Sequence, residues 1–171
     1  IRDGSTTYFS GTYTMNDLKT WHLYTGTYDG SYVGLYIDGI EVVKTSHSDK
    51  TIYNDNGPLR IGVDDYADSS FPDRLFNGVI DDVRIYNRAL TSEEVYKLYY
   101  KPEGNLTVTN LISGTDKNLP VAHYKLNESS GTVALDSSGN NYHGINNGAT
   151  VAAIGHDGRV NGAYSFDGSS N

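Results

Sequence analysis

Aspartate is the most abundant acidic residue type in this chain, and its carboxylate could bind a metal ion or take part in catalysis. The 171 residues include 21 acidic and 13 basic side chains, and sixteen of the acidic ones are aspartates. Ca²⁺ prefers carboxylate and carbonyl oxygens as ligands, so an aspartate-rich chain is suited to it. Cysteine is absent, which excludes disulfides, thiolate metal sites and cysteine nucleophiles. The net charge of −8 argues against unassisted binding to nucleic acid or to anionic membranes.

Three acidic segments are candidate sites. The first is a loop with Asp64, Asp65, Tyr66 and Asp68, the second is the pair of consecutive strand residues Asp81 and Asp82, and the third is a turn with Asp136. Each also has an ordinary structural interpretation. An acidic loop is often only a solvated surface. In a strand, alternation lets only one of two consecutive side chains face a given side. Asp136 is followed by Ser, Gly and Asn residues, which is typical of a turn that the aspartate itself stabilises.

Motifs of covalent or phosphate chemistry are missing from the sequence. It contains neither a G-x-S-x-G nucleophile motif nor a phosphate-binding P-loop. The histidines are scattered without the spacing of a metal site: His22, His47, His123, His143 and His156. The sequence therefore favours a non-catalytic protein.

The elements that must position these residues are mostly strands. Fifteen tyrosines and nineteen glycines, with only five glutamates, make an all-β composition rich in turns. Asp38-Gly39 is the strongest hairpin signal. Alternation and turn residues predict strands at residues 20–28, 33–37, 40–44, 58–63, 75–86, 121–126 and 160–166. We expect Trp21, within the first strand, to lie in the core.

One short helix is predicted at residues 92–99. Thr91 is the candidate N-cap, and Glu94 completes a capping box. Val95, Leu98 and Tyr99 give the helix one apolar face. Because a helix of this length is unstable alone, it must dock on the sheet.

Three segments in the first half, residues 21–30, 35–39 and 76–90, resemble the LamG-like jelly-roll family. This family belongs to the concanavalin A-like lectin/glucanase superfamily. The resemblance implies an all-β fold, an antiparallel jelly-roll β-sandwich. The capped helix that follows residue 90 also resembles the end of the family's domain.

The second half resembles the family as well, but out of order. Residues 121–131, 136–144 and 162–168 resemble segments that open the family's domain. Residues 1–100 are thus interpreted as a C-terminal half, 101–118 as a linker and 119–171 as an N-terminal half. Three explanations stay open: a window across two tandem repeats, a circular permutation, or exchange of half-domains between chains. Hydrogen bonds from 119–171 to 75–86 of the same chain would support permutation.

The resemblance also implies sites. A structural calcium ion would be held by Asp136, by the carbonyls of Asn141 and His143, and by Asp81 rather than Asp82. Sugar-binding loops of lectin-like sandwiches use aromatic and acidic residues, which makes the loop with Asp64, Asp65, Tyr66 and Asp68 a candidate rim. The E-x-D-x-x-E strand of the superfamily's glucanases does not occur in this sequence.

The function expected from these features is an extracellular or cell-surface module without catalytic activity. It would bind a glycan or an extracellular protein, as part of a larger repetitive surface protein with a structural calcium site. The alternative is a building block of a surface fibre, adhesin stalk or filament that assembles with neighbouring copies of the chain by strand or half-domain exchange. Neither nucleic acid nor membrane insertion is expected.

Overall fold

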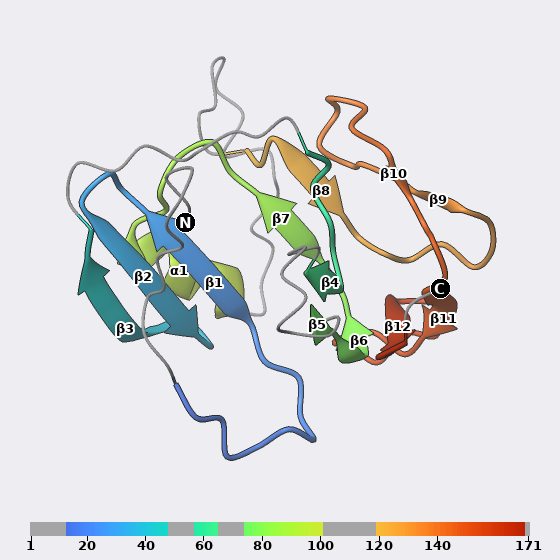
Figure 1. Cartoon of the computed structure of the whole chain (residues 1–171), viewed down its shortest axis with the longest axis horizontal. Coiled ribbons are helices and arrows are strands. Elements are labelled where there is room, and N and C mark those ends of the chain that lie inside the picture. Colours follow the sequence, from blue (N-terminus) through green and yellow to red (C-terminus); the bar gives the residue numbers. More distant parts are fainter. Residues whose placement is uncertain (1–12, 48–56, 65–73, 101–118, 170–171) are drawn as a thin grey trace. The chain divides into compact units, whose positions relative to one another are not determined.

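The structure is a computed structural model that describes residues 13–47, 57–64, 74–100 and 119–169. The chain forms two compact units (Figure 1). The first unit consists of Ile1–Gly57 and Asn87–Asn118, and the second of Pro58–Tyr86 and Leu119–Asn171. Among the described residues, antiparallel strands dominate both units, and one short helix accompanies them in the first.

The first unit contains a three-stranded antiparallel sheet in the order β1-β2-β3. Its strands are β1 (Tyr24–Tyr28), β2 (Tyr32–Ile37) and β3 (Ile40–Ser46). The turn between β2 and β3 places Asp38 at φ 52° and Gly39 at φ 81°. Consecutive left-handed residues match the twist of a tight hairpin, and Asp-Gly adopts them readily. The hairpin predicted at Asp38-Gly39 is therefore confirmed.

The helix α1 (Ser92–Tyr99) begins with the predicted capping box. The Thr91 hydroxyl accepts a hydrogen bond from the Glu94 N–H at 3.2 Å, and the Glu94 carboxylate accepts one from the Thr91 N–H at 2.8 Å. Arg88 donates two further bonds to this carboxylate, at 2.8 and 2.7 Å. These bonds lower the pKa of Glu94 to about 2, and the bond from Arg88 has the largest effect. Together they outweigh burial, which raises this pKa.

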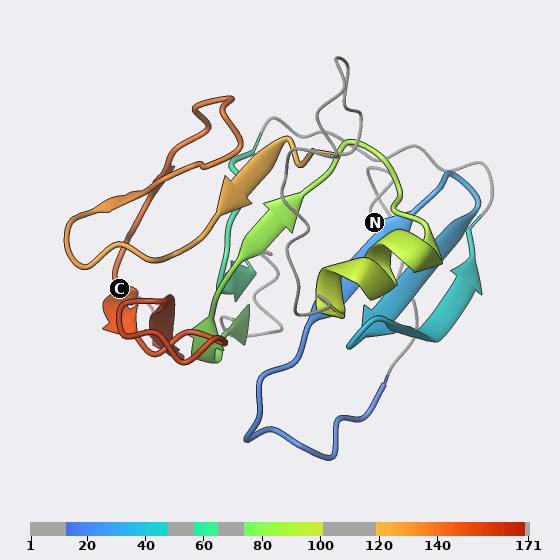
Figure 2. The same ribbon diagram turned by 180° about the vertical axis from the view of Figure 1, so that it is seen from behind.

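Helix α1 lies against one face of the first unit's sheet (Figure 2). Val95 is its fully buried residue, and Leu90 before the helix is buried too. The Tyr36 hydroxyl of β2 hydrogen-bonds with the Ser92 hydroxyl at 3.1 Å. The Gly39 turn approaches the backbone of Tyr96 so closely that a Cβ at this glycine would lie 3.2 Å from it. These contacts dock the short helix, as its length requires.

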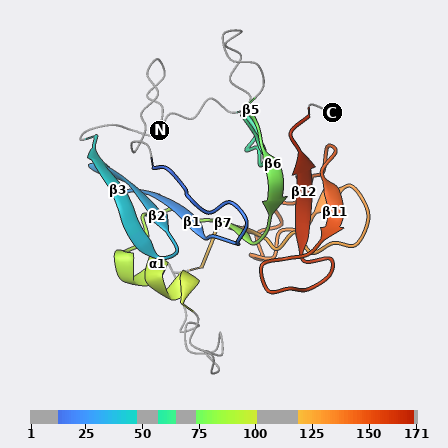
Figure 3. The ribbon, with the colours of Figure 1, turned by 90° about the horizontal axis from the view of Figure 1, so that it is seen from below.

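The second unit is built around a sheet in the order β11-β12-β6, which Figure 3 shows side by side. Its strands are β6 (Asn77–Ile80), β11 (Thr150–Ala153) and β12 (Ala163–Asp167). Three two-stranded ribbons accompany it: β7 (Val83–Ile85) with β8 (Ala122–Tyr124), β4 (Val63–Asp64) with β5 (Arg74–Leu75), and β9 (Val133–Ala134) with β10 (Gly144–Ile145).

Two of these antiparallel pairings join segments far apart in the sequence. Strand β7 pairs with β8, which sets Val83 opposite Tyr124. Strand β6 pairs with β12, which sets Val79 opposite Ser165. The core of the unit likewise combines both segments, with Tyr124, Leu126 and Tyr164 buried and Ile80 packed against them. Residues after the predicted linker thus pair with strands before it in the same chain.

The prediction of one long strand at residues 75–86 is wrong, because the strand is interrupted twice. It is divided into β5, β6 and β7, with breaks at Phe76 and at Asp81-Asp82. Asp82 adopts φ 54°, a left-handed conformation that ends an extended strand. Gly78 lies inside β6 and does not break it. The break at Asp81-Asp82 therefore turns the chain from the β6 sheet into the β7–β8 ribbon.

Candidate functional site

The predicted sugar-binding loop is only partly within the described residues. Asp64 ends the short strand β4, where its backbone lies opposite Arg74 of β5. Asp65, Tyr66 and Asp68 lie outside the described residues. This rim therefore stays a prediction from the sequence.

Asp136 is a buried carboxylate, 8% exposed, that accepts four hydrogen bonds. One oxygen, Oδ1, accepts the N–H groups of His123 at 2.9 Å and Ser138 at 2.8 Å. The other, Oδ2, accepts the Ser138 hydroxyl at 2.8 Å and the Tyr142 N–H at 3.0 Å. Burial raises the pKa of Asp136, but the donors together outweigh it and hold this pKa well below its usual range.

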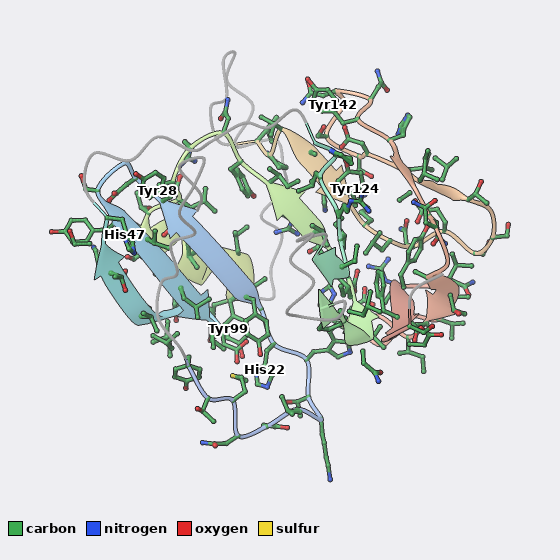
Figure 4. The ribbon with its side chains drawn as sticks, viewed as in Figure 1. His22, Tyr28, His47, Tyr99, Tyr124 and Tyr142 are labelled. Atoms are coloured by element: carbon green, nitrogen blue, oxygen red, sulfur yellow. The ribbon has the colours of Figure 1, made fainter. Side chains whose placement is uncertain are left out.

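The turn after Asp136 is fixed by bonds of its own. The Asp136 N–H donates to Nδ1 of His143 at 3.0 Å, and the Tyr124 hydroxyl donates to the Tyr142 carbonyl at 2.6 Å. Figure 4 labels Tyr124 and Tyr142 in this part of the second unit. Asn141 is exposed and has φ 61°. The loop is therefore held around the carboxylate by strand β8 and by the turn itself.

Asp81 and Asp82 have different partners. The Asp81 side chain, 7% exposed, accepts the His156 N–H at 3.0 Å and contacts Nδ1 of the same histidine at 2.6 Å. Asp82 contacts Nε2 of His123 at 2.6 Å and also bonds to Arg84. His123 is the residue whose N–H Asp136 accepts. The bonds thus connect Asp136 with Asp82 through His123, whereas Asp81 joins the loop of His156.

This arrangement bears on how a calcium ion would be held. Each Asp136 oxygen already accepts two donors, which uses the lone pairs that a cation would need. Within the described ranges, no group of three or more His, Cys, Asp or Glu side chains is gathered as a metal site. An ion at Asp136 would have to displace some of these donors, and calcium stays a prediction from the resemblance.

Each of the four glutamates that the structure describes bonds to another side chain of the chain. Glu93 pairs with Lys97 one helical turn away, and Glu94 is held by Arg88. The remaining two, Glu41 and Glu128, accept the hydroxyls of Tyr36 and Tyr164, respectively. A glycosidase needs two carboxylates that face a common substrate. These four side chains have structural partners instead.

Exposed tyrosines of α1 and of its C-cap residue, Tyr100, form a surface that the sequence analysis missed. Tyr96, Tyr99 and Tyr100 are 49%, 48% and 58% exposed, and we call them the tyrosine surface. The rings of Tyr96 and Tyr100 stack, with centroids 5.6 Å apart and an interplanar angle of 17°. We had assigned Tyr99 to the buried face of the helix. The spacing of three and four residues between these tyrosines was the available signal.

Trp21 was also predicted incorrectly, because it is 39% exposed rather than part of the core. The predicted first strand began at residue 20, but β1 begins at Tyr24. Residues 17–23 are held instead by polar bonds, including one from the Leu23 N–H to the Asp38 carboxylate at 2.9 Å. Trp21 therefore precedes the sheet and does not pack within it.

Comparison with known proteins defines the class. Residues 2–96 match the family model of the concanavalin A-like lectin/glucanases superfamily, of the laminin G type. The chain belongs to this family. No curated protein and no solved structure matches the chain. The described residues include no helix long and apolar enough to cross a membrane.

Proposed function

We propose that this chain is a non-catalytic extracellular module that binds carbohydrate through the tyrosine surface of α1, as part of a larger repetitive surface protein. Membership of a lectin-like superfamily supports the class of ligand. The observation that carries the proposal is the grouping of Tyr96, Tyr99 and Tyr100 in the last turn and C-cap of one docked helix, with each residue about half exposed.

Tyrosine suits this role because it combines an apolar ring with a hydroxyl that donates and accepts hydrogen bonds. A sugar offers both kinds of partner, with C–H groups on one face of its ring and hydroxyls at the edge. The stacked rings of Tyr96 and Tyr100 restrict each other's rotation, which lowers the entropy lost on binding. Protein ligands use the same features, so they are the second class to be tested.

A glycan array tests this proposal. We expect the chain to bind one or more glycans. The triple variant Tyr96→Ala, Tyr99→Ala, Tyr100→Ala should lose at least about 90% of that signal, since it removes the apolar ring surface that a sugar would cover. Tyr142→Ala is the matched control, because Tyr142 is 61% exposed but belongs to the second unit. Circular dichroism checks that each variant is folded.

Two results would contradict the proposal. Equal loss in the triple variant and in Tyr142→Ala would place binding elsewhere. An array without hits, together with capture of a surface protein that the triple variant no longer captures, would replace carbohydrate by a protein ligand at the same surface.

The structural calcium ion is a separate part of the proposal, with a thermal test. If an ion binds, its removal by EDTA lowers the melting temperature and Ca²⁺ restores it. At a free Ca²⁺ concentration of 100 times the dissociation constant, binding would add about 2.7 kcal/mol to the free energy of unfolding. Mg²⁺ is the control, because its small octahedral shell rarely replaces calcium. Superimposable melting curves with EDTA and Ca²⁺ would remove the ion and leave Asp136 as a carboxylate that organises the loop.

The order of the half-domains is also proposed, as a circular permutation within one chain. The pairings of β7 with β8 and of β6 with β12 support it, because they join the two segments in the order that permutation requires. A building block of a fibre or adhesin stalk is the alternative. There, the same pairings would form between neighbouring copies.

A further inference from the structure

A continuous chain of hydrogen bonds joins the segment before β1 to the turn between β2 and β3. The Thr20 hydroxyl donates to the Asp17 carboxylate at 2.8 Å and lies 3.2 Å from Nε2 of His22. The other ring nitrogen of His22, Nδ1, lies 2.7 Å from the Asp38 carboxylate. We call Asp17, Thr20, His22 and Asp38 the His22 chain. It lies within the first unit.

Counting protons along the His22 chain fixes the charge of the histidine. The Thr20 hydroxyl has one proton, and it gives this proton to Asp17. Its oxygen can then only accept from Nε2 of His22. A carboxylate can only accept, so Nδ1 must also donate, to Asp38. With all three contacts formed as hydrogen bonds, both ring nitrogens carry protons, so this arrangement requires a protonated His22 between the two carboxylates.

We propose that the His22 chain is a pH-dependent latch, which holds residues 17–20 on the His22 ring when His22 is protonated and releases them when it is not. Loss of the proton at Nε2 leaves the Thr20 hydroxyl with two acceptors and one proton. Thr20 must then give up either Asp17 or His22, so residues 17–20 lose one of the two bonds that attach them to the His22 ring. The bonds of His22 and Leu23 to Asp38 do not depend on this proton.

The charges around His22 agree with this assignment. The hydrogen bond to Asp38 raises the pKa of His22 from 6.5, burial opposes it, and the charges of Asp38 and Asp17 add to the rise. The hydrogen bond from the Lys19 N–H has the largest effect on Asp17, followed by that from the Thr20 hydroxyl. Both lower the pKa of Asp17, so this carboxylate is ionised. Helix α1 approaches the turn through Tyr96 and Tyr99, which are neutral at these pH values.

The sign of the pH dependence follows from the raised pKa. The latch is fully formed below the pKa that His22 has in the unfolded chain, about 6.5. It is lost as the pH rises through the higher pKa that His22 has in the folded chain. Trp21 is the chain's single tryptophan and lies between Thr20 and His22, so its fluorescence reports on the latch. Figure 4 labels His22 at one end of the first unit.

The test is a fluorescence titration of the full chain between about pH 5 and 9. We expect the emission of Trp21 to change with a midpoint above 6.5 in the unsubstituted chain, and Asp38→Asn to move this midpoint down toward 6.5. Asparagine retains the left-handed turn conformation that Asp38 has, so the hairpin is kept. Asp29→Asn is the matched control, because it changes the other Asp-Gly turn of the sheet, away from His22.

A second variant separates the latch from a simple ion pair. Thr20→Val keeps the pair of His22 with Asp38 but removes the bond to Asp17. It should leave the titration of the His22 ring, followed by NMR, close to the unsubstituted chain, while the amplitude of the Trp21 change falls by at least about half. The proposal is overturned if the Trp21 signal does not change with pH, if Asp38→Asn and Asp29→Asn shift its midpoint equally, or if Thr20→Val retains the full amplitude.

Discussion

Replacing Asp136 by alanine is expected to lower the melting temperature by about 5–10 °C. The substitution removes an acceptor from three backbone N–H groups and one hydroxyl at a site that is 8% exposed. Buried donors without partners retain their full desolvation cost, which is why the loss exceeds that of an average hydrogen bond. The effect should extend beyond the turn, because the His123 N–H belongs to strand β8.

The matched control for this substitution is Asp167→Ala. Asp167 is exposed, and its carboxylate accepts the N–H and the hydroxyl of Ser169, two residues later in the chain. Asp136 makes the same two bonds with Ser138 and adds those from His123 and Tyr142. We expect Asp167→Ala to melt within about 2 °C of the unsubstituted chain. Equal melting temperatures for the two variants would show that the long-range donors contribute nothing.

Local sequence patterns predicted the elements whose geometry depends on neighbours in the chain. The capping box at Thr91 and Glu94 and the hairpin at Asp38-Gly39 need only a few consecutive residues of the right type, and both are present. The strand alternation around residues 24–28 and 33–37 likewise predicted β1 and β2. The family was correctly inferred from three such segments taken together.

Errors arose where a residue's environment depends on distant segments. Trp21 belongs to a strand-like pattern, but bonds to Asp38 hold its segment outside the sheet. The break in the strand at Asp82 depends on partners such as His123, 41 residues away. No local pattern shows that the Asp136 carboxylate accepts four donors. These properties come from tertiary packing, which periodicity does not encode.

Cysteines at positions 79 and 165 are expected to form a disulfide within a single chain. Val79 of β6 lies directly opposite Ser165 of β12, and directly opposite residues of antiparallel strands have Cβ atoms about 4.5–5.5 Å apart. That separation is close enough for a disulfide after a small adjustment. The chain has no cysteine of its own, so the double variant Val79→Cys, Ser165→Cys contains only the designed pair. Non-reducing electrophoresis and intact mass measure the product.

The double variant Val79→Cys, Thr150→Cys is the control for geometry. Thr150 of β11 lies opposite Ser165, so it is two strands away from Val79, roughly 9.6 Å. This exceeds the reach of a disulfide, so we expect the control to stay reduced. A disulfide in the control alone, or none in either variant, would mean that β12 does not pair with β6.

Concentration separates the permuted chain from the exchanged assembly. A disulfide within one chain forms to the same extent at any protein concentration, because its two cysteines belong to one folded unit. A disulfide between chains requires association, so its share falls on dilution before oxidation. We expect an oxidised monomer at all concentrations. A covalent dimer that disappears on dilution would instead establish half-domain exchange, and it would make the fibre or stalk the better account of the function.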